Sequence, residues 1–189
     1  MREDVDHDGQ PSDEKLARQA QRGDLAAFGA LVRRHQARVF RAAVRVAGNR
    51  GDAEDACQEA FVRAFRALAR FDPLRPFGAW VARIAINRAL TRASRRRPLR
   101  PLEEAESKAD PAPSPEARAA KEEESDRLRR AVAELSPADR ALLALRYDED
   151  APISEIAATL GIRENAVKVR LLRARERLLR LIPTEEDAP

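Results

Sequence analysis

Residues 153–175 hold the pattern that most constrains how this chain can fold. Ile156, Ala157 and Leu160 fall on one face of a helix, and Gly161 follows them. A glycine turns with positive φ at little steric cost, and Ala157 is small enough for two helices to cross closely. A second helical pattern follows, with apolar residues every three or four positions at Ala166, Val167, Leu171, Ala174 and Leu178. This is the pattern of a helix-turn-helix, whose second helix enters the major groove of DNA.

The outer face of that second helix is basic. It carries Lys168, Arg173 and Arg175, with Arg170 on its flank. An ordinary helical hairpin with a solvated basic face is the alternative interpretation. DNA binding is favoured because the small residue at the crossing, the turn glycine and the basic second helix occur together.

The composition favours an all-α fold. Hydrophobic residues make up 43% of the 189-residue chain and aromatic residues only 4%, while the helix-forming Ala, Leu and Arg are abundant. A single cysteine excludes an internal disulfide framework, and no apolar run approaches the ~20 residues of a membrane span. The start of the chain lacks the apolar core of a signal peptide. We therefore expect a soluble cytoplasmic protein without membrane insertion.

Two small helical domains are expected on either side of a linker. A short helix begins after Ser12, Gly23-Asp24 separates it from a long amphipathic helix, and two further helices follow. Residues 98–121 contain five prolines and no apolar periodicity, which is typical of a flexible linker. Ser136-Pro137 is then a strong helix start. The expected domains are therefore residues 13–97 and residues 122–182.

The helix expected from Asp52 onward has an acidic face opposite an apolar stripe. That face begins with Asp52, Glu54, Asp55, Gln58 and Glu59. Acids at the start of a helix interact favourably with its macrodipole, which explains Asp52 and Asp55. Glu59 lies a turn later, so a docking surface for a basic partner is the second interpretation. Cys57 falls within the apolar stripe, which favours a buried, inert thiol over a redox sensor.

A proline-restricted loop leads into a helix that becomes steadily more basic. The loop runs from Phe71 to Phe77, and the segment after it carries Trp80 and the arginines Arg83, Arg88, Arg92, Arg95, Arg96 and Arg97. No acidic residue occurs between Asp72 and Glu103, whereas a solvated face usually mixes both signs. Arginines bind phosphates and aromatic rings stack on bases, so we expect this segment to contact nucleic acid. For Trp80 itself, core packing is favoured.

No catalytic or metal site is expected. The chain has two histidines and one cysteine, which lie far from any paired nucleophile, and it lacks a glycine-rich phosphate loop. His35 borders the apolar stripe of its helix without a second ligand at metal-binding spacing, so it is expected to be a packed histidine. An enzyme is therefore disfavoured, and no cofactor or metal is expected.

Several segments in order carry a resemblance to a known family. They are Gly23–Phe28, Asp52–Val62, Phe77–Asn87, the arginine run 95–97, Leu135-Ser136-Pro137 and the helix-turn-helix. Over residues 13–182 the chain resembles the extracytoplasmic-function (ECF) sigma factors of bacterial RNA polymerase. The resemblance implies a transcription initiation factor with the family's regions two and four in its two domains. It also implies three partners, namely core RNA polymerase, promoter DNA and an anti-sigma factor.

The resemblance assigns roles to individual residues. The acidic face at Asp52, Glu54, Asp55, Gln58 and Glu59 would dock on the clamp helices of the polymerase. The −10 element would be bound by Phe71, Arg75, Phe77, Asn87, Arg88, Thr91, Arg92, Arg95 and Arg96, with the loop from Phe71 to Phe77 holding a flipped base. The −35 element would be read by Arg163, Asn165, Lys168, Val169, Leu172 and Arg173, with Arg170 and Arg175 on phosphates.

Two residues depart from the family's pattern. Thr91 stands where the family usually has an acidic residue, which concerns the −10 contact. Arg163 stands at a capping position, which weakens the start of that helix but adds a phosphate contact. The alternative class is a stand-alone regulator that binds duplex DNA and never joins the polymerase. The acidic face and the basic helix argue against it, because such a regulator needs neither.

Overall fold

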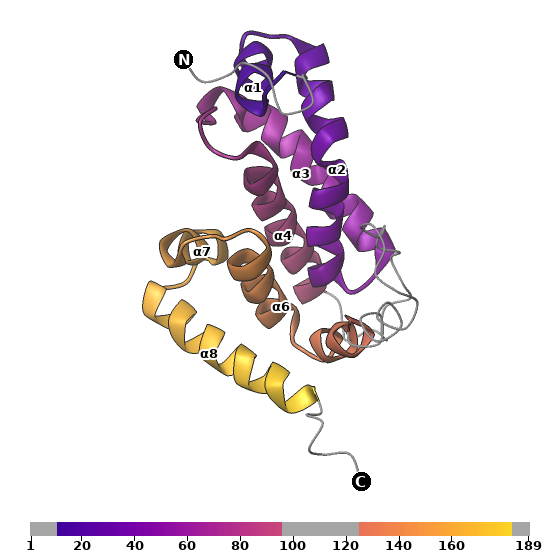
Figure 1. The fold of residues 1–189 in the computed structure, drawn as a ribbon, viewed down its shortest axis with the longest axis vertical. Coiled ribbons are helices and arrows are strands. Elements are labelled where there is room, and N and C mark those ends of the chain that lie inside the picture. Colours follow the sequence, from indigo (N-terminus) through magenta and orange to yellow (C-terminus); the bar gives the residue numbers. More distant parts are fainter. Residues whose placement is uncertain (1–10, 96–124, 183–189) are drawn as a thin grey trace, which may run out of the picture.

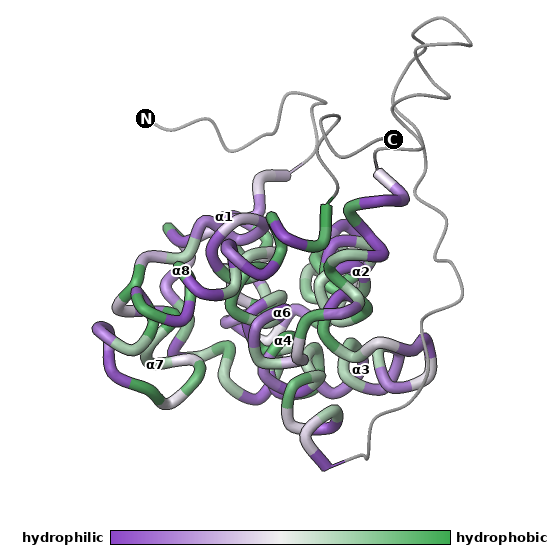
Figure 2. The backbone as a smooth tube through the Cα atoms, turned by 90° about the horizontal axis from the view of Figure 1, so that it is seen from below, coloured by the Kyte–Doolittle hydropathy of each residue, from purple (hydrophilic) through white to green (hydrophobic). Residues whose placement is uncertain are grey.

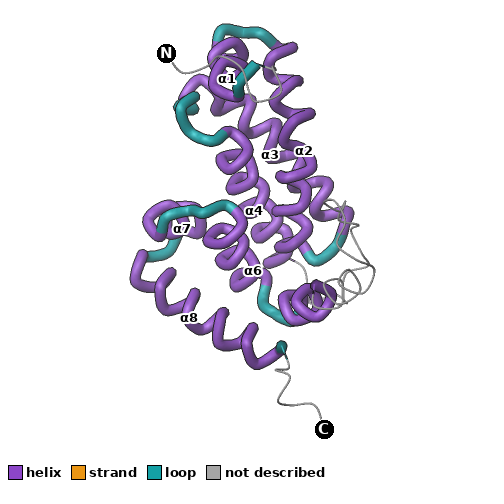
Figure 3. The backbone as a smooth tube through the Cα atoms, viewed as in Figure 1, coloured by secondary structure: helices purple, strands orange, loops and turns teal. Residues whose placement is uncertain are grey.

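The computed structural model describes residues 11–95 and 125–182, and the elements of both ranges are helices (Figures 1 and 3). We call these ranges the N-terminal part and the C-terminal part. The predicted all-α fold is confirmed. The linker expected at 98–121 and Arg96 lie outside the described residues. None of the described helices is long and apolar enough to cross a membrane.

The N-terminal part is a bundle built around α2 (Leu25–Ala47). This helix packs against α1 (Asp13–Gln21), α3 (Arg50–Ala67) and α4 (Phe77–Arg95), and α3 also packs along α4. A 3-10 turn, η1 (Leu68–Arg70), follows α3. Alanines occupy the buried faces of α3 at 53, 56, 60 and 64 and of α4 at 82, 85 and 89. Because these side chains are small, the helix axes can approach closely.

Local capping explains where the helices begin. Ser12 accepts a hydrogen bond from the backbone N–H of Lys15, and Asp24 accepts one from that of Ala27 at 3.0 Å. The helix expected from Asp52 starts two residues earlier, at Arg50, because Asn49 is its N-cap. The Asn49 side chain accepts from the Asp52 backbone N–H at 2.9 Å and donates to the Asp52 carboxylate at 2.7 Å. The Asp52 backbone N–H and the Asn49 side-chain amide at this helix end therefore both have hydrogen-bond partners.

The C-terminal part contains the predicted helix-turn-helix. A helical stretch at 125–133 leads to α6 (Pro137–Leu143), a π-helical turn η2 (Ala144–Asp148), α7 (Ile153–Leu160) and α8 (Glu164–Leu181). Ser136 caps α6, as expected, and Gly161 ends α7 with φ of 66°. Because α7 packs on α8 and Ile156, Val167 and Leu171 are buried, the helix-turn-helix prediction is confirmed.

The two parts share one hydrophobic core. Val39 and Ile86 of the N-terminal part belong to the same buried cluster as Leu142, Leu145 and Ile156 of the C-terminal part. α2 and α4 both pack against α6 and η2, as Figure 1 shows for α4 and α6. Hydrophobic and hydrophilic residues alternate along the helices in Figure 2, as expected when each helix buries one face. The C-terminal part therefore lies against α2 and α4.

Candidate nucleic-acid and polymerase interfaces

The outer face of α8 is exposed and basic. Its predicted −35 residues are all exposed: Arg163, Asn165, Lys168, Val169, Arg170, Leu172, Arg173 and Arg175. Leu172 has 58% of its surface exposed, whereas Leu171 and Ala174 on the opposite face are buried. Arg163 is the N-cap residue of α8 and makes no side-chain capping bond, as the sequence indicated.

The cations of this face have no acidic partner among the described residues. Lys168, Arg170, Arg173 and Arg175 form no salt bridge there, whereas Arg177 of the same helix pairs with Asp139 at 2.9 Å. An unpaired guanidinium or ammonium on an exposed helix face can bind phosphate or the edges of bases. The arrangement is that of a helix ready to enter a major groove.

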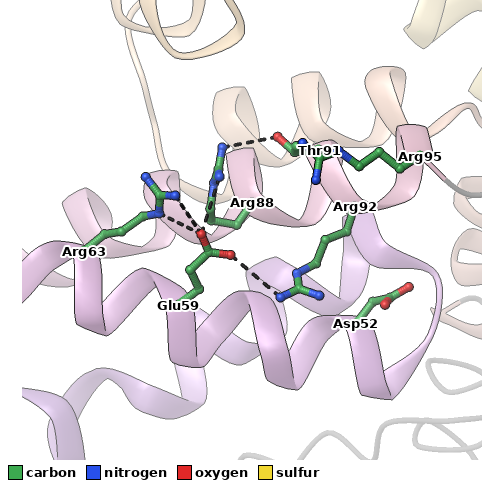
Figure 4. Close-up of a pocket in the computed structure, with 7 residues that line it drawn as sticks. All are labelled: Asp52, Glu59, Arg63, Arg88, Thr91, Arg92 and Arg95. Atoms are coloured by element: carbon green, nitrogen blue, oxygen red, sulfur yellow. Dashed lines mark hydrogen bonds and ion pairs between the residues drawn. The ribbon is translucent and has the colours of Figure 1, made fainter.

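A second basic surface is the groove between α3 and α4 (Figure 4), lined by Asp52, Glu59, Arg63, Arg88, Thr91, Arg92 and Arg95. Glu59 lies among its arginines. The Glu59 carboxylate lies 2.8 Å from Arg63 Nη2, 3.5 Å from Arg88 Nη1 and 3.8 Å from Arg92 Nη2. The hydrogen bond from Arg63 lowers the pKa of Glu59, and the charge of Arg88 contributes to the same shift. The groove is therefore a charge-compensated basic surface.

The groove brings together residues that the sequence placed in two separate sites. Asp55 of the predicted docking face accepts from Arg92 Nη1 at 3.0 Å, and Arg92 belongs to the predicted −10 set. Thr91 donates to the Asn87 carbonyl at 2.8 Å and accepts from Arg88 at 3.3 Å. Thr91 therefore helps to orient the Arg88 guanidinium. Arg95, at the end of α4, is exposed.

The structure separates Asp52 from the rest of the predicted docking face. Asp52 is only 4% exposed, and its carboxylate accepts from the Asn49 side chain. Glu54, Asp55 and Gln58 are exposed, although Glu54 pairs with Arg50 at 2.8 Å. The first of the two sequence interpretations, a role at the helix start, therefore fits Asp52 better than docking does.

The predicted base-holding rings are buried. Phe77 is 0% and Phe71 7% exposed, and Phe71 stacks on Trp80 with a centroid distance of 4.4 Å. Because these rings pack inside the protein, their burial argues against direct stacking on a base. Arg75 and Leu74, between them, are exposed. The packing expected for Trp80 agrees with its stacked, half-buried ring.

Gln21 shapes this loop, and sequence reasoning missed it. Its side-chain amide donates to the carbonyls of Leu68 and Phe71 at 2.9 and 2.7 Å. A polar residue in the last turn of α1 gives no local signal of a partner so distant in the chain. The Asp72 carboxylate also accepts from the Leu74 backbone N–H at 3.0 Å. The start of the loop 72–76 is therefore held by hydrogen bonds of the Gln21 and Asp72 side chains.

The described residues contain no cluster of three potential metal ligands. His35 bonds to Asp13, with Nε2 2.6 Å from Oδ2, and its ring lies 5.7 Å from the ring of Phe77. Burial raises the pKa of the Cys57 thiol, which makes the reactive thiolate rarer. Both arrangements agree with the packed histidine and inert thiol expected from the sequence.

Comparison with known proteins identifies the class of the chain. The family model for sigma-70 region 2 matches residues 31–98, and the model for sigma-70 region 4 matches residues 125–178. A helix-turn-helix behind a region-2 bundle defines a sigma factor of the sigma-70 class. The chain is 36% identical over 185 residues to RNA polymerase sigma factor CnrH of Cupriavidus metallidurans, covering 93% of this chain and 97% of that protein.

A second relative narrows the assignment. The chain is 34% identical over 173 residues to the ECF RNA polymerase sigma factor SigM of Mycobacterium tuberculosis, covering 90% of this chain and 85% of that protein. The chain belongs to the ECF family of RNA polymerase sigma factors. Members of this family are transcription initiation factors that direct the polymerase to specific promoters, so the family predicted from the sequence is confirmed.

Solved structures share the fold. The structure of CnrH in complex with the cytosolic domain of CnrY matches with a TM-score of 0.59 and 32% identity, over 93% of this chain and 99% of that chain. The sigma factor RpoE in complex with the anti-sigma factor NepR, from Bartonella quintana, matches with a TM-score of 0.60 and 18% identity, over 84% and 98% of the two chains.

Proposed function

We propose that this sigma factor acts in the cytoplasm by binding DNA and polymerase, without catalysing a reaction of its own. It binds through three surfaces. In this proposal α8 reads the −35 element, α4 and the loop 72–76 engage the −10 element, and α3 docks on core RNA polymerase. The proposed domains are residues 13–97 and 122–182, with 98–121 as the linker. The observation that most strongly supports the proposal is the exposed basic face of α8, whose cations have no acidic partner among the described residues.

The −35 contact is proposed to combine base reading with phosphate contacts. Lys168, Val169, Leu172 and Arg173 are exposed near the start and middle of α8, the portion of a recognition helix that meets base edges. Arg170 and Arg175 flank them and suit phosphates, which fix the register of the helix on the duplex. Arg163 at the N-cap adds a cation where the helix dipole already favours an anion.

The −10 contact is proposed to lie along α4. Arg88, Arg92 and Arg95 provide cations, and Asn87 and Thr91 provide polar groups on the same helix. In the adjoining loop, Arg75 and Leu74 are exposed, so they replace the buried rings of Phe71 and Phe77 as the groups that meet a flipped base.

Melting the promoter DNA costs about 1.4 kcal/mol per base-pair step, so a bubble of about ten steps costs on the order of 14 kcal/mol.

The loop supplies too little energy to melt a promoter alone, because each stacked base contributes about 1–3 kcal/mol. The protein is therefore proposed to select the sequence and start the bubble, while the polymerase supplies the rest. A permanganate footprint with the isolated protein should show no open bubble. An open bubble without polymerase would overturn this division of labour.

Polymerase docking is proposed for the exposed acids of α3. Glu54, Asp55 and Gln58 are exposed, and Glu59 borders them, whereas buried Asp52 keeps its capping role. Run-off transcription with core polymerase on a library of genomic promoters tests the whole proposal. We expect transcripts from a defined promoter set that share two elements. A chain that binds duplex DNA but neither co-purifies with core polymerase nor starts transcripts would contradict it.

An anti-sigma factor is the proposed regulator. Two solved structures similar in fold each hold a second protein, CnrY with CnrH and the anti-sigma factor NepR with RpoE. We infer that such a partner covers the polymerase-binding faces of this chain. A pull-down from the unstressed native host should recover it. Recovery of the chain without a bound partner would instead favour regulation through the amount of sigma factor that the cell synthesises.

A further inference from the structure

Gln21 connects α1 to the turn that precedes the loop 72–76. It is the last residue of α1, and its side-chain amide donates to the carbonyl of Leu68 at 2.9 Å and to that of Phe71 at 2.7 Å. A glutamine amide has two N–H donors, so both are used. The two carbonyls lie 47 and 50 positions further along the chain, and the packing of α1 on η1 brings them to Gln21 (Figure 1).

The two carbonyls do not depend on Gln21 equally. The carbonyl of Leu68 also accepts from the backbone N–H of Phe71 at 3.0 Å, within η1. The carbonyl of Phe71 accepts from Gln21 and from no other group of the described residues. A carbonyl shielded from water is costly to leave without a donor. Without the Gln21 amide, the peptide between Phe71 and Asp72 would therefore turn toward water.

The residues after Phe71 form a stiff turn. The Asp72 carboxylate accepts from the backbone N–H of Leu74 at 3.0 Å, and the Asp72 carbonyl accepts from that of Arg75 at 3.0 Å. Pro73 and Pro76 each have a fixed φ. Because such a turn moves as one piece, its direction is set by the residues at which the chain enters and leaves it.

The exit and the entry of this turn are held differently. At the exit, Phe77 is completely buried and the Pro76 carbonyl accepts from the Trp80 backbone N–H at 3.1 Å. At the entry, the Phe71 ring stacks on Trp80, and Phe71 has ψ of 133°. Stacking fixes the ring, whereas rotation about ψ changes the direction of the chain after Phe71. The hydrogen bond from Gln21 is the contact that opposes this rotation.

The turn carries two side chains into solvent. Leu74 is 59% exposed, and 55% of the Arg75 side chain is exposed. Arg75 donates one bond to Glu155 of α7 at 2.9 Å, which leaves other donors of its guanidinium available. A binding group must stay within about 0.5 Å of its productive position. A rotation at Phe71 would displace Leu74 and Arg75 together.

We propose that Gln21 is a positioning residue for base capture at the −10 element, because its amide fixes the peptide from which the loop 72–76 projects. Gln21 itself touches no base in this arrangement. The inference rests on the proposed function, in which Leu74 and Arg75 meet the flipped base. It adds that α1, which carries no predicted DNA-binding residue, sets the base preference of the loop.

Transcription by the full chain with core polymerase, from a promoter library varied at each −10 position, tests this role. Gln21→Met keeps the length of the side chain and removes both donors. Discrimination at the flipped base should fall about tenfold, within the range of one lost stacking contact. Discrimination at the other −10 positions and at the −35 element should stay unchanged. A loss of stability alone would lower transcription from all promoters by one factor, so the ratio between bases isolates positioning.

Two matched variants examine the hydrogen bonds themselves. Gln21→Lys keeps N–H donors on a side chain of sufficient reach, so it should retain most of the discrimination. Gln19→Met makes the same exchange in α1 at a glutamine whose side chain has no hydrogen-bond partner among the described residues, and should leave discrimination unchanged. Uniform weakening on all promoters by Gln21→Met, or an equal loss in Gln21→Met and Gln21→Lys, would overturn the proposal.

Substitution of the loop itself separates this role of Gln21 from the proposed function. The doubly substituted Leu74→Ala, Arg75→Ala chain should lose discrimination at the same base as Gln21→Met. If this chain loses discrimination while Gln21→Met retains it, the loop meets the base without help from Gln21, and only the role of Gln21 is refuted. If this chain keeps its discrimination, the loop does not meet the base, and the proposed −10 contact of the loop fails together with the role of Gln21.

Discussion

At the scale of single residues, one contact ties three helices of the N-terminal part together. His35 of α2 bonds to Asp13 of α1 at 2.6 Å and lies against Gly78 of α4. A Cβ atom at position 78 would lie 2.5 Å from His35 Nδ1, which is closer than Cβ atoms approach other heavy atoms in proteins. Gly78 is therefore required by close packing, and the Asp13 carboxylate keeps the imidazole in the place that this packing needs.

Asp13→Asn should destabilise the protein at neutral pH. Burial alone raises the pKa of Asp13, but the hydrogen bonds from His35 and Arg34 outweigh it and hold the pKa below its ordinary value of 3.8. A carboxyl group with a lowered pKa stabilises the fold above its unfolded pKa, and this contribution is lost as the pH falls through the folded value. We expect a loss of about 1–3 kcal/mol in the free energy of unfolding at pH 7.

Thermal unfolding at two pH values checks this pH dependence of the stability. The midpoint of Asp13→Asn should lie below that of the unsubstituted chain at pH 7, and the difference should shrink as the pH falls below 3.8 and through the lowered pKa of folded Asp13. An equal difference at both pH values would show that the effect comes from packing and not from the charge.

Arg173→Ala should relax base choice at the −35 element. Arg173 is exposed on α8 and has no acidic partner among the described residues. A bidentate contact from arginine to a base is worth about 1–3 kcal/mol of discrimination. Transcription from a library varied at the −35 element measures this loss. Arg177→Ala is the matched control, because Arg177 is paired with Asp139. Uniform weakening on all promoters would instead make Arg173 a phosphate contact.

At the scale of elements, the packing of α3 on α4 couples the acids of one helix to the arginines of the other. Glu59→Gln removes the charge that Arg63, Arg88 and Arg92 share. Exposed pairs are each worth about 0.2–1 kcal/mol, so we expect the isolated protein to bind single-stranded −10 DNA a few fold more tightly, with a steeper salt dependence. Fluorescence anisotropy at two salt concentrations measures both quantities.

A matched control separates the groove from general charge. Glu54→Gln removes the same charge from the same helix, but within the described part of the chain Glu54 pairs with Arg50 of α3 itself and with no arginine of α4. Its effect on DNA binding should be smaller than that of Glu59→Gln. Equal effects from the two substitutions would mean that net charge, and not the paired groove, governs the affinity.

The starts of helices could be predicted because their signals are local. Ser12, Asp24 and Ser136 each bond to a backbone N–H three residues ahead, so the partner lies within the same few residues of sequence. The helix expected from Asp52 begins two residues earlier, at Arg50, because the Asn49 side chain caps it. Gly161 was predictable for the same local reason, since its positive φ suits glycine.

The exposure of many residues of the candidate site could be predicted from the sequence, but the contacts between residues of different helices could not. The exposure of the α8 face follows from its apolar period, which places Val167, Leu171 and Ala174 inside. The burial of Phe71 does not follow from any period, because a proline-restricted loop carries no such pattern, whereas Phe77 begins α4 and lies one turn before the buried Val81. The contact of Glu59 with Arg88 joins residues 29 positions apart, and only the packing of two helices brings them together.

At the scale of the whole molecule, the sequence predicted two domains and left their relation open. The contacts that answer this question join residues very far apart, such as Arg38 with Glu149 at 111 positions and Arg140 with Val46 at 94. Arg38, Arg140 and Glu149 each read as an ordinary charged surface position in the sequence. Their pairing depends on complementary shapes of two folded surfaces, which a single sequence pattern does not encode.

The shared core predicts that the free protein unfolds as one unit. Leu145 is completely buried in η2, which packs against α2 and α4. Leu145→Ala should cost about 2–5 kcal/mol, and at this chain length each kcal/mol lowers the unfolding midpoint by about 2–4 °C. Because the core is continuous, calorimetry should show one transition that moves as a whole, and amide protection should fall in α2 as well as in α6.

Leu128→Ala provides the comparison, since Leu128 is an exposed leucine of the C-terminal part that lies outside the shared core. Its midpoint should stay close to that of the unsubstituted chain. If the unsubstituted protein instead melted in two steps, and Leu145→Ala moved only one of them, the two parts would be energetically independent. The α6–η2 surface would then contribute little to holding the helix-turn-helix against the N-terminal bundle.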